Sequence, residues 1–143
     1  MDGTRNSNQR QTILEELRGM RSHPTACELY EVVRRRMPRI SLGTVYRNLD
    51  LLARQGHIRR LAGDGAQARF DGHPDDHAHL RCVSCGCVAD VARSAGDRPP
   101  ALPRAPAGHL ILGARVEFLG LCPLCRAELG PERVADLRRA WRA

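Results

Sequence analysis

Apolar residues recur at the three- and four-residue spacing of an amphipathic helix in three stretches before residue 56. The apolar positions are Ile13, Leu14, Leu17 and Met20, then Leu29, Val32 and Val33, and finally Leu42, Val45, Leu49 and Leu52. The pattern therefore predicts three consecutive helices, each with one buried face.

Residues that cap helices mark where these three helices begin and end. Candidate N-caps are Asn6 or Ser7 for the first helix, Thr25 for the second and Ser41 for the third. Glu28 follows Thr25 at the spacing of a capping box. We expect Pro38 to stop the second helix and Gly56 to end the third as a left-handed C-cap.

After Gly56 the pattern changes to two short segments, Ile58–Leu61 and Gln67–Asp71, separated by the turn sequence Gly63-Asp64-Gly65. This arrangement predicts a two-stranded hairpin. Three short helices followed by a hairpin are typical of a winged helix-turn-helix. In that module the third helix enters the major groove of DNA and the hairpin lies along the phosphates. A small helical domain with a solvated basic surface is the alternative.

The second half of the chain predicts a smaller domain. Val116–Cys122 has the pattern of a strand, and Pro131–Trp141 that of a terminal helix. In that helix we expect Pro131 at the first position and Val134, Leu137 and Trp141 facing inward. Four prolines within Ser94–Gly108 exclude a long helix there. The predicted fold class is α+β, with a winged-helix domain over residues 1–72 and a second domain over residues 73–143.

The distribution of charge suggests what the first domain binds. The chain has 143 residues, with 23 Arg, no Lys and 16 acidic residues, and a formal net charge of +7. Residues 1–72 hold 13 Arg and 8 acidic residues, whereas residues 73–143 hold 10 Arg and 8 acidic residues. The basic first half indicates nucleic-acid contact. Because aromatic residues make up only 3% of the chain, a base-stacking platform for single strands is excluded.

Candidate DNA contacts lie beside the apolar stripe of the third helix. Ser41, Gly43, Thr44, Tyr46 and Arg47 stand near its start and offer groups that reach base edges in the major groove. On the hairpin, Arg59, Arg60 and Arg69 add positive charge, and Arg59 and Arg60 are the candidate phosphate contacts.

Six cysteines indicate metal binding. The chain starts with a polar segment and has no run of about 20 apolar residues, so we expect a cytoplasmic protein without a membrane span. In a reducing compartment cysteines favour metal sites over disulfides. Cys82-x-x-Cys85 and Cys122-x-x-Cys125 supply the four thiolates of a closed structural zinc site that joins two distant strands.

Redox chemistry is the alternative for these paired cysteines, but neither pair stands in a thioredoxin-like βαβ pattern. The two remaining cysteines, Cys27 and Cys87, do not fit the pairing. We expect them to be small buried residues.

A second set of ligands surrounds His77-Ala78-His79. Alternate side chains of a strand point to the same side, so the two imidazoles are expected to face one ion. Asp71 at the end of the hairpin and Asp90 beyond the first cysteine pair add carboxylates. A mixed nitrogen and oxygen set suits Fe(II), Mn(II) or Zn(II). Surface histidines with no ligand role are the alternative.

Several strings, in order and over about residues 5–126, resemble the ferric uptake regulator family of metal-responsive bacterial repressors. The matching strings are Gln9-Arg10-x-x-Ile13-Leu14, His23-Pro24-Thr25-Ala26, the run Ile40–Leu49, Arg69-Phe70-Asp71, Asp76-His77-x-His79, Cys82-x-x-Cys85-Gly86 and Cys122-x-x-Cys125. The resemblance implies a homodimer with an N-terminal winged helix and a C-terminal α/β dimerisation domain that contains structural Zn(II). It also implies a regulatory metal at the hinge of the two domains.

By this resemblance the regulatory ligands are His23, Asp71, His77, His79 and Asp90, and Tyr46 and Arg47 align with recognition-helix contacts. Aspartate at both carboxylate positions is typical of the peroxide-sensing branch, whereas Arg47 is a departure from it, because that branch can carry Asn there. Gly72 and His73 stand where the zinc-uptake branch often has a thiolate ligand nearby.

The histidine-rich third site of some relatives is not expected, because Asp76 precedes His77 and Ala78 separates the histidine pair. We therefore predict two metals per subunit.

The function predicted from this resemblance is repression of transcription with Fe(II) or Mn(II) as the regulatory ion, double-stranded operator DNA as the partner and no small organic substrate. Peroxide would oxidise a ligand histidine and release the operator. The alternative is a metal-uptake regulator for iron, manganese or zinc that responds to occupancy without oxidation. A metal-dependent hydrolase using His77, His79 and Asp71 is disfavoured, because the chain has no evident nucleophile, and we expect no enzyme activity.

Overall fold

The computed structural model describes residues 2–61, 67–75, 77–92 and 101–141. The predicted turn Gly63-Asp64-Gly65, Asp76 and residues 94–100 of the proline-rich segment lie outside the described residues. The chain forms two compact units. Unit 1 comprises Met1–Asp76 with Gly86–Val88, and unit 2 comprises His77–Cys85 with Ala89–Ala143.

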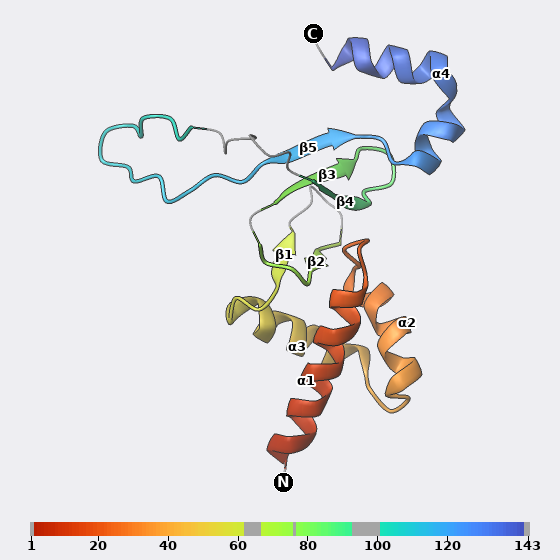
Figure 1. The fold of residues 1–143 in the computed structure, drawn as a ribbon, viewed down its shortest axis with the longest axis vertical. Helices are drawn as coiled ribbons and strands as arrows, with labels where there is room; N and C mark the ends of the chain where they lie inside the picture. Colours follow the sequence, from red (N-terminus) through yellow and green to blue (C-terminus); the bar gives the residue numbers. More distant parts are fainter. Residues whose placement is uncertain (1, 62–66, 76, 93–100, 142–143) are drawn as a thin grey trace. The chain divides into compact units, whose positions relative to one another are not determined.

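Unit 1 contains three helices, α1 (Asp2–Gly19), α2 (Ala26–Arg36) and α3 (Leu42–Arg54), as Figure 1 shows. Their apolar faces meet in one core that confirms most of the predicted stripe positions. The fully or almost fully buried members are Ile13, Leu17, Ala26, Leu29, Val33, Ile40, Val45, Leu49, Leu52, Ile58 and Phe70. Burial of this much apolar surface is the main force that holds the three helices together.

The helix ends confirm two of the three predicted N-caps. Thr25 and Glu28 form a complete capping box at α2, and the Ser41 side chain accepts a hydrogen bond from the Thr44 amide at α3. Gly56 follows the C-cap with φ of +76°, as predicted. The prediction that Asn6 or Ser7 caps α1 was wrong, because α1 begins at Asp2. No proline interrupts residues 2–10, so the helix continues through both polar residues.

The predicted hairpin is present and completes the winged helix. Strand β1 (Arg59–Leu61) pairs antiparallel with β2 (Arg69–Asp71), with Arg60 opposite Phe70. The far side of β2 contacts the segment before α2, where the Phe70 amide donates to the Pro24 carbonyl over 2.9 Å and Thr25 forms a bridge with Arg69. The hairpin is thereby joined to the start of α2.

Unit 2 is built on a three-stranded sheet in the order β4-β3-β5 (Figure 1). Its strands are β3 (Ala78–Cys82), β4 (Val88–Val91) and β5 (Glu117–Gly120), and β5 occupies the centre of the predicted Val116–Cys122 strand. The β3 and β5 strands are parallel, with Cys82 opposite Gly120. Residues 101–116 contain no helix. For residues 101–108, the described part of the proline-rich segment, this agrees with the prediction made from the prolines.

Helix α4 (Pro123–Ala140) consists of two segments that meet at Gly130, whose φ of 72° and ψ of 168° are not helical. Pro131 opens the second segment, as predicted, but the first segment, which starts at Pro123, was not foreseen. The inward orientation of the terminal helix was also wrong: Leu137 is 39% exposed and Trp141 is 63% exposed. The spacing of apolar residues identifies an apolar face, whereas burial depends on what packs against it. Among the helices of the described residues, none is long and apolar enough to cross a membrane.

Candidate metal centres and DNA-binding face

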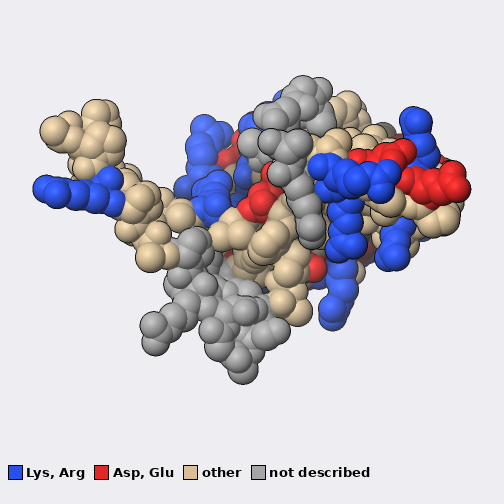
Figure 2. All heavy atoms as spheres, turned by 90° about the horizontal axis from the view of Figure 1, so that it is seen from above, with Lys and Arg blue, Asp and Glu red and all other residues tan. Residues whose placement is uncertain are grey.

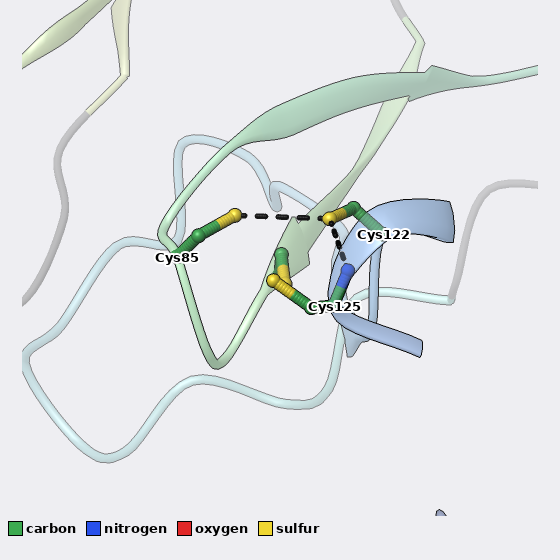
Figure 3. A group of neighbouring side chains, drawn as sticks. Cys85, Cys122 and Cys125 are labelled. Atoms are coloured by element: carbon green, nitrogen blue, oxygen red, sulfur yellow. Dashed lines mark hydrogen bonds between the residues drawn. The ribbon is translucent and has the colours of Figure 1, made fainter. Parts of the chain in front are cut away.

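Four cysteines of unit 2 come together at one end of its sheet. Cys82 ends β3, Cys85 lies in the turn that follows, Cys122 caps α4 and Cys125 lies in the first turn of that helix. The four sulfur atoms all lie within 4.8 Å of one another. The sulfurs of Cys85 and Cys122 are 3.8 Å apart. Figure 3 shows these two side chains pointing toward each other.

The pairing of β3 with β5 explains why cysteines so distant in sequence meet. Cys82 is in register with Gly120, and the Val83 amide donates to the Gly120 carbonyl over 2.9 Å, so the chain reaches Cys122 beside the first pair. A Cβ atom at Gly120 would lie 3.3 Å from Cδ1 of Leu80, closer than most such contacts. The parallel register therefore places the two cysteine pairs together, as the expected joining of distant strands requires.

The cluster fits a tetrahedral zinc ion. A Zn–S bond of about 2.3 Å implies a sulfur–sulfur distance of about 3.8 Å along a tetrahedron edge, which the Cys85–Cys122 distance matches. Burial alone would raise the pKa of Cys82, but hydrogen bonds from the backbone of Cys122, Cys85 and Ser84 lower it to about 6. For Cys125, a hydrogen bond with Ser84 lowers the pKa, yet hydrogen bonds with the other three thiols and burial raise it to about 12.

Four thiolates this close together carry a further cost. Once one thiol has lost its proton, a second negative charge beside it is unfavourable unless a cation is present. A divalent cation would remove this obstacle and be bound by all four thiolates. Cys27 and Cys87, which are both half-buried, are not members of the cluster.

Two histidines and an aspartate form a second group in unit 2. Nε2 of His77 lies 2.9 Å from Oδ1 of Asp90, and Nε2 of His79 lies 3.6 Å from the same oxygen. The two imidazole rings lie 4.5 Å apart, centre to centre. His77 immediately precedes β3 and His79 lies within it, so the two rings lie beside one another, as predicted, while β4 supplies the carboxylate. Two nitrogens and one oxygen in this arrangement suit a divalent ion such as Fe(II), Mn(II) or Zn(II).

A third, buried pair lies inside unit 1. Nδ1 of His23 is 3.7 Å from Oδ1 of Asp71, and the two side chains are 2% and 0% exposed. Oδ1 of Asp71 also accepts a hydrogen bond from the His73 amide over 2.8 Å. His23 has a φ of +45°, a left-handed conformation that is unfavourable for a residue with a side chain.

The side chains at the start of α3 form a chain of hydrogen bonds. The hydroxyls of Ser41 and Thr44 are 2.9 Å apart, and Nη2 of Arg47 donates to Oγ1 of Thr44 over 3.2 Å. Tyr46 is 41% exposed, and a hydrogen bond with the Cys27 side chain raises the pKa of its hydroxyl. The predicted base-contacting residues therefore lie on an open face of α3.

The two candidate phosphate contacts of the hairpin have partners within unit 1. Arg59 donates to the Pro74 carbonyl over 2.9 Å, and Arg60 lies 3.7 Å from a carboxylate oxygen of Asp50 on α3. The guanidinium of each arginine remains positively charged and can still contact a DNA phosphate. Figure 2 shows arginines next to acidic side chains on one face of the molecule, so positive charge there is interspersed with negative charge.

One residue near these sites was missed by sequence reasoning about ligands. Arg69 was noted as a basic residue of the hairpin and as part of a family string, without a role at either site. Its side chain is 15% exposed and is hydrogen-bonded to three separate segments. No local pattern marks such an arginine, because its partners are distant in sequence.

Comparison with known proteins gives consistent matches. The family model described as "Ferric uptake regulator family" matches residues 1–101. The peroxide operon regulator of Bacillus subtilis is 33% identical over 123 residues, which cover 86% of this chain and 85% of that protein. The peroxide-responsive repressor PerR of Staphylococcus epidermidis is 32% identical over 126 residues, covering 88% and 84%.

Similarity extends to solved structures. The crystal structure of the Campylobacter jejuni peroxide stress regulator superposes with a TM-score of 0.66 at 24% identity, covering 85% of this chain and 92% of that one. At that identity the superposition supports the fold alone, and it agrees with the α+β class and the winged-helix arrangement.

Proposed function

The chain belongs to the ferric uptake regulator family, and we propose that it is a metal-dependent transcriptional repressor that senses peroxide. The observation that carries this proposal is the presence of two histidine–aspartate groups. In one, His23 lies beside Asp71; in the other, His77 and His79 lie beside Asp90. Both groups use aspartate, and the two curated relatives described above are named peroxide regulators. A protein with this function is a regulator and not an enzyme. It acts in the cytoplasm.

Two metals take part. Structural Zn(II) is held by Cys82, Cys85, Cys122 and Cys125, and its role is to join the strands of unit 2 and support a homodimer. The regulatory Fe(II) or Mn(II) takes its ligands from both histidine–aspartate groups, that is, from His23, Asp71, His77, His79 and Asp90. The nitrogen and oxygen donors of these residues suit either ion.

Ligands from both units would make metal occupancy a conformational signal. A metal that binds all five ligands favours the one arrangement of the two units that brings them together. In a homodimer that arrangement sets the distance between two α3 helices, which must enter successive major grooves about 34–36 Å apart. Metal and operator DNA would then strengthen each other's binding.

On the DNA, α3 reads the operator and the hairpin contacts its backbone. We assign base contacts to Ser41, Thr44, Tyr46 and Arg47, and phosphate contacts to Arg59 and Arg60. The exposed start of α3 and the hydrogen bond that orients Arg47 support this assignment. A guanidinium is suited to bidentate contact with guanine.

Peroxide acts through the ligand histidines. When bound, iron supplies the one-electron chemistry that activates hydrogen peroxide. The carbon–hydrogen bond of His23 or His77 becomes a carbon–oxygen bond, and the other peroxide oxygen leaves as water. The modified imidazole is a poorer ligand, so the regulatory site loses affinity for metal and the repressor leaves the operator.

Mass spectrometry and DNA binding test this function together. Protein loaded with Fe(II) or with Mn(II) is treated with peroxide, and operator binding and peptide masses are measured. We expect the His23 or His77 peptide to gain the mass of one oxygen atom with iron only, together with loss of DNA binding. Unchanged mass and retained binding with iron would refute peroxide sensing.

A metal-uptake regulator is the second candidate, because the same donor set holds iron, manganese or zinc without any oxidation. In that case micromolar peroxide leaves DNA binding unchanged, whereas a chelator releases the operator. Manganese-loaded protein is the matched control for both candidates, since it does not support the oxidation.

A further inference from the structure

Arg69, on β2, is the centre of a hydrogen-bond network within unit 1. Its Nη1 atom donates to the His23 carbonyl over 3.1 Å and to Oε2 of Glu28 over 3.0 Å. Its Nε atom donates to the Gly86 carbonyl over 3.1 Å. One largely buried guanidinium thus joins three segments that lie 17 to 46 residues away in the sequence.

The first of these segments carries a proposed metal ligand in an unfavourable conformation. His23 has a φ of +45° and immediately precedes Pro24, and such a conformation persists only where surrounding contacts hold it. Two of the contacts on this stretch are hydrogen bonds to its backbone, from the Arg69 guanidinium to the His23 carbonyl and from the Phe70 amide to the Pro24 carbonyl. The guanidinium therefore acts on the backbone of the residue whose imidazole faces Asp71.

The second segment is the capping box of α2. Oε2 of Glu28 accepts from the Thr25 amide over 2.8 Å as well as from Arg69, so the cap and the arginine share one oxygen. A charge-assisted hydrogen bond at this point is stronger than a neutral one. It joins the first turn of α2 to the strand that ends in Asp71.

The third segment follows the zinc-binding turn. Gly86 comes directly after Cys85, has a φ of +72° and belongs to unit 1 together with Cys87 and Val88. The Arg69 bond to its carbonyl therefore ties the exit of the Cys82-x-x-Cys85 turn to the strand that carries Asp71.

We propose that Arg69 is a positioning residue for the regulatory metal: it holds the His23 backbone in its left-handed conformation and joins it to the segment that leaves the zinc turn. This inference rests on the proposed function, because it takes His23 and Asp71 to be regulatory ligands. Arg69 itself is no ligand, so its loss weakens metal binding by leaving His23 unpositioned.

The Arg69→Gln variant tests this role by titration with Mn(II). We expect Mn(II) affinity to fall about 10- to 100-fold, the range found for residues that orient metal ligands. Zinc content should stay at the wild-type level, and saturating Mn(II) should restore operator binding. In the metal-free protein, hydrogen exchange of the peptide that contains His23 should be faster than in the wild type.

Arg36→Gln is the matched control. Arg36 also links two helices of unit 1, because its Nη1 contacts Glu15 and Glu16 of α1 at 3.1 and 2.8 Å, but it contacts none of the proposed ligands. We expect its Mn(II) affinity to equal that of the wild type. Equal losses in Arg69→Gln and Arg36→Gln, or no loss in either, would overturn the proposal.

Arg69→Lys covers the case in which Arg69→Gln does not fold. A lysine keeps the charge but cannot reach three acceptors in the planar arrangement of a guanidinium, so we expect a folded protein with a smaller loss of Mn(II) affinity. Wild-type affinity in this variant, or failure of both variants to fold, would show that Arg69 serves the fold alone. Asp71→Asn separates the two levels of the proposal: if it leaves Mn(II) binding unchanged, the proposed ligand set itself is wrong.

Discussion

The imidazole of His23 and the carboxylate of Asp71 lie 3.7 Å apart in the interior of the winged-helix unit, almost completely removed from solvent. A buried carboxylate is costly unless it is paired and hydrogen-bonded. Here the His73 amide satisfies one oxygen, and the histidine lies beside it. A nitrogen and a carboxylate oxygen are donors that suit a divalent ion, which is why we propose both residues as ligands of the regulatory metal.

Asp71→Asn should abolish the response to the regulatory metal. The amide keeps an oxygen that can accept from His73 but loses the negative charge that a divalent ion needs. We expect Mn(II) affinity to fall by more than about 100-fold, beyond the range for residues that only orient a ligand. Metal titration followed by operator binding measures this, with zinc content as the control.

Cys82→Ser should remove zinc and destabilise unit 2. Three thiolates and a hydroxyl are a poor substitute for the four-sulfur site, and zinc binding contributes directly to folding. Metal analysis and thermal unfolding should show loss of both zinc and a cooperative transition. Cys87→Ser is the matched control and should retain a full complement of zinc, because Cys87 lies outside the cluster.

Thr25→Ala should lower the free energy of unfolding by about 1 kcal/mol, the usual cost of losing an N-cap side chain. The Thr25 hydroxyl accepts from the Glu28 amide over 3.2 Å, and this bond is lost. Urea unfolding measures the change. Thr25→Ser preserves the hydroxyl and should stay close to the wild type; an equal loss in both variants would contradict the capping explanation.

Arg47→Ala should weaken operator binding by about 5- to 150-fold, since a good bidentate contact to a base contributes about 1–3 kcal/mol. Mn(II) affinity should not change, because Arg47 contacts Thr44 of its own helix. Binding to the operator and to unrelated DNA, measured at one salt concentration, separates specific from general affinity. Unchanged operator binding would remove Arg47 from the DNA contacts.

Phe118→Glu should produce a monomer. Phe118 and Leu119 on β5 are 48% and 49% exposed, and Trp141 adds a further exposed apolar side chain, which is unusual for a protein that acts alone. We propose that a second copy of the chain covers these residues in the homodimer. Sedimentation of the zinc-loaded protein measures the effect, and a dimer of wild-type stability would place the interface elsewhere.

Local features of the fold were predictable from the sequence. The Thr25–Glu28 capping box, the Ser41 N-cap and the left-handed Gly56 were each confirmed, because they depend on residues within one turn of a helix. The start of α1 was not, because a helix N-terminus has no sharp signal when the preceding residues also tolerate helix.

For the candidate sites too, local spacing predicted some features and missed others. Cysteine spacing indicated a four-sulfur site, and the alternation of His77 and His79 placed both imidazoles beside one another. Spacing did not reveal that His23 faces Asp71; the family resemblance suggested it. The inward orientation of Leu137 and Trp141 was wrong, since an apolar pattern does not identify the surface that covers it.

The sequence by itself determined the three helices of unit 1, the hairpin, the basic first half and the chemical classes of both candidate ligand sets, because these follow from neighbouring residues and their charges. Only the tertiary structure decided that β3 and β5 bring Cys82 and Cys122 together, and that Arg69 reaches His23, Glu28 and Gly86. Those contacts join segments as far as 46 residues apart. They depend on strand register and core packing, which no short stretch of sequence contains.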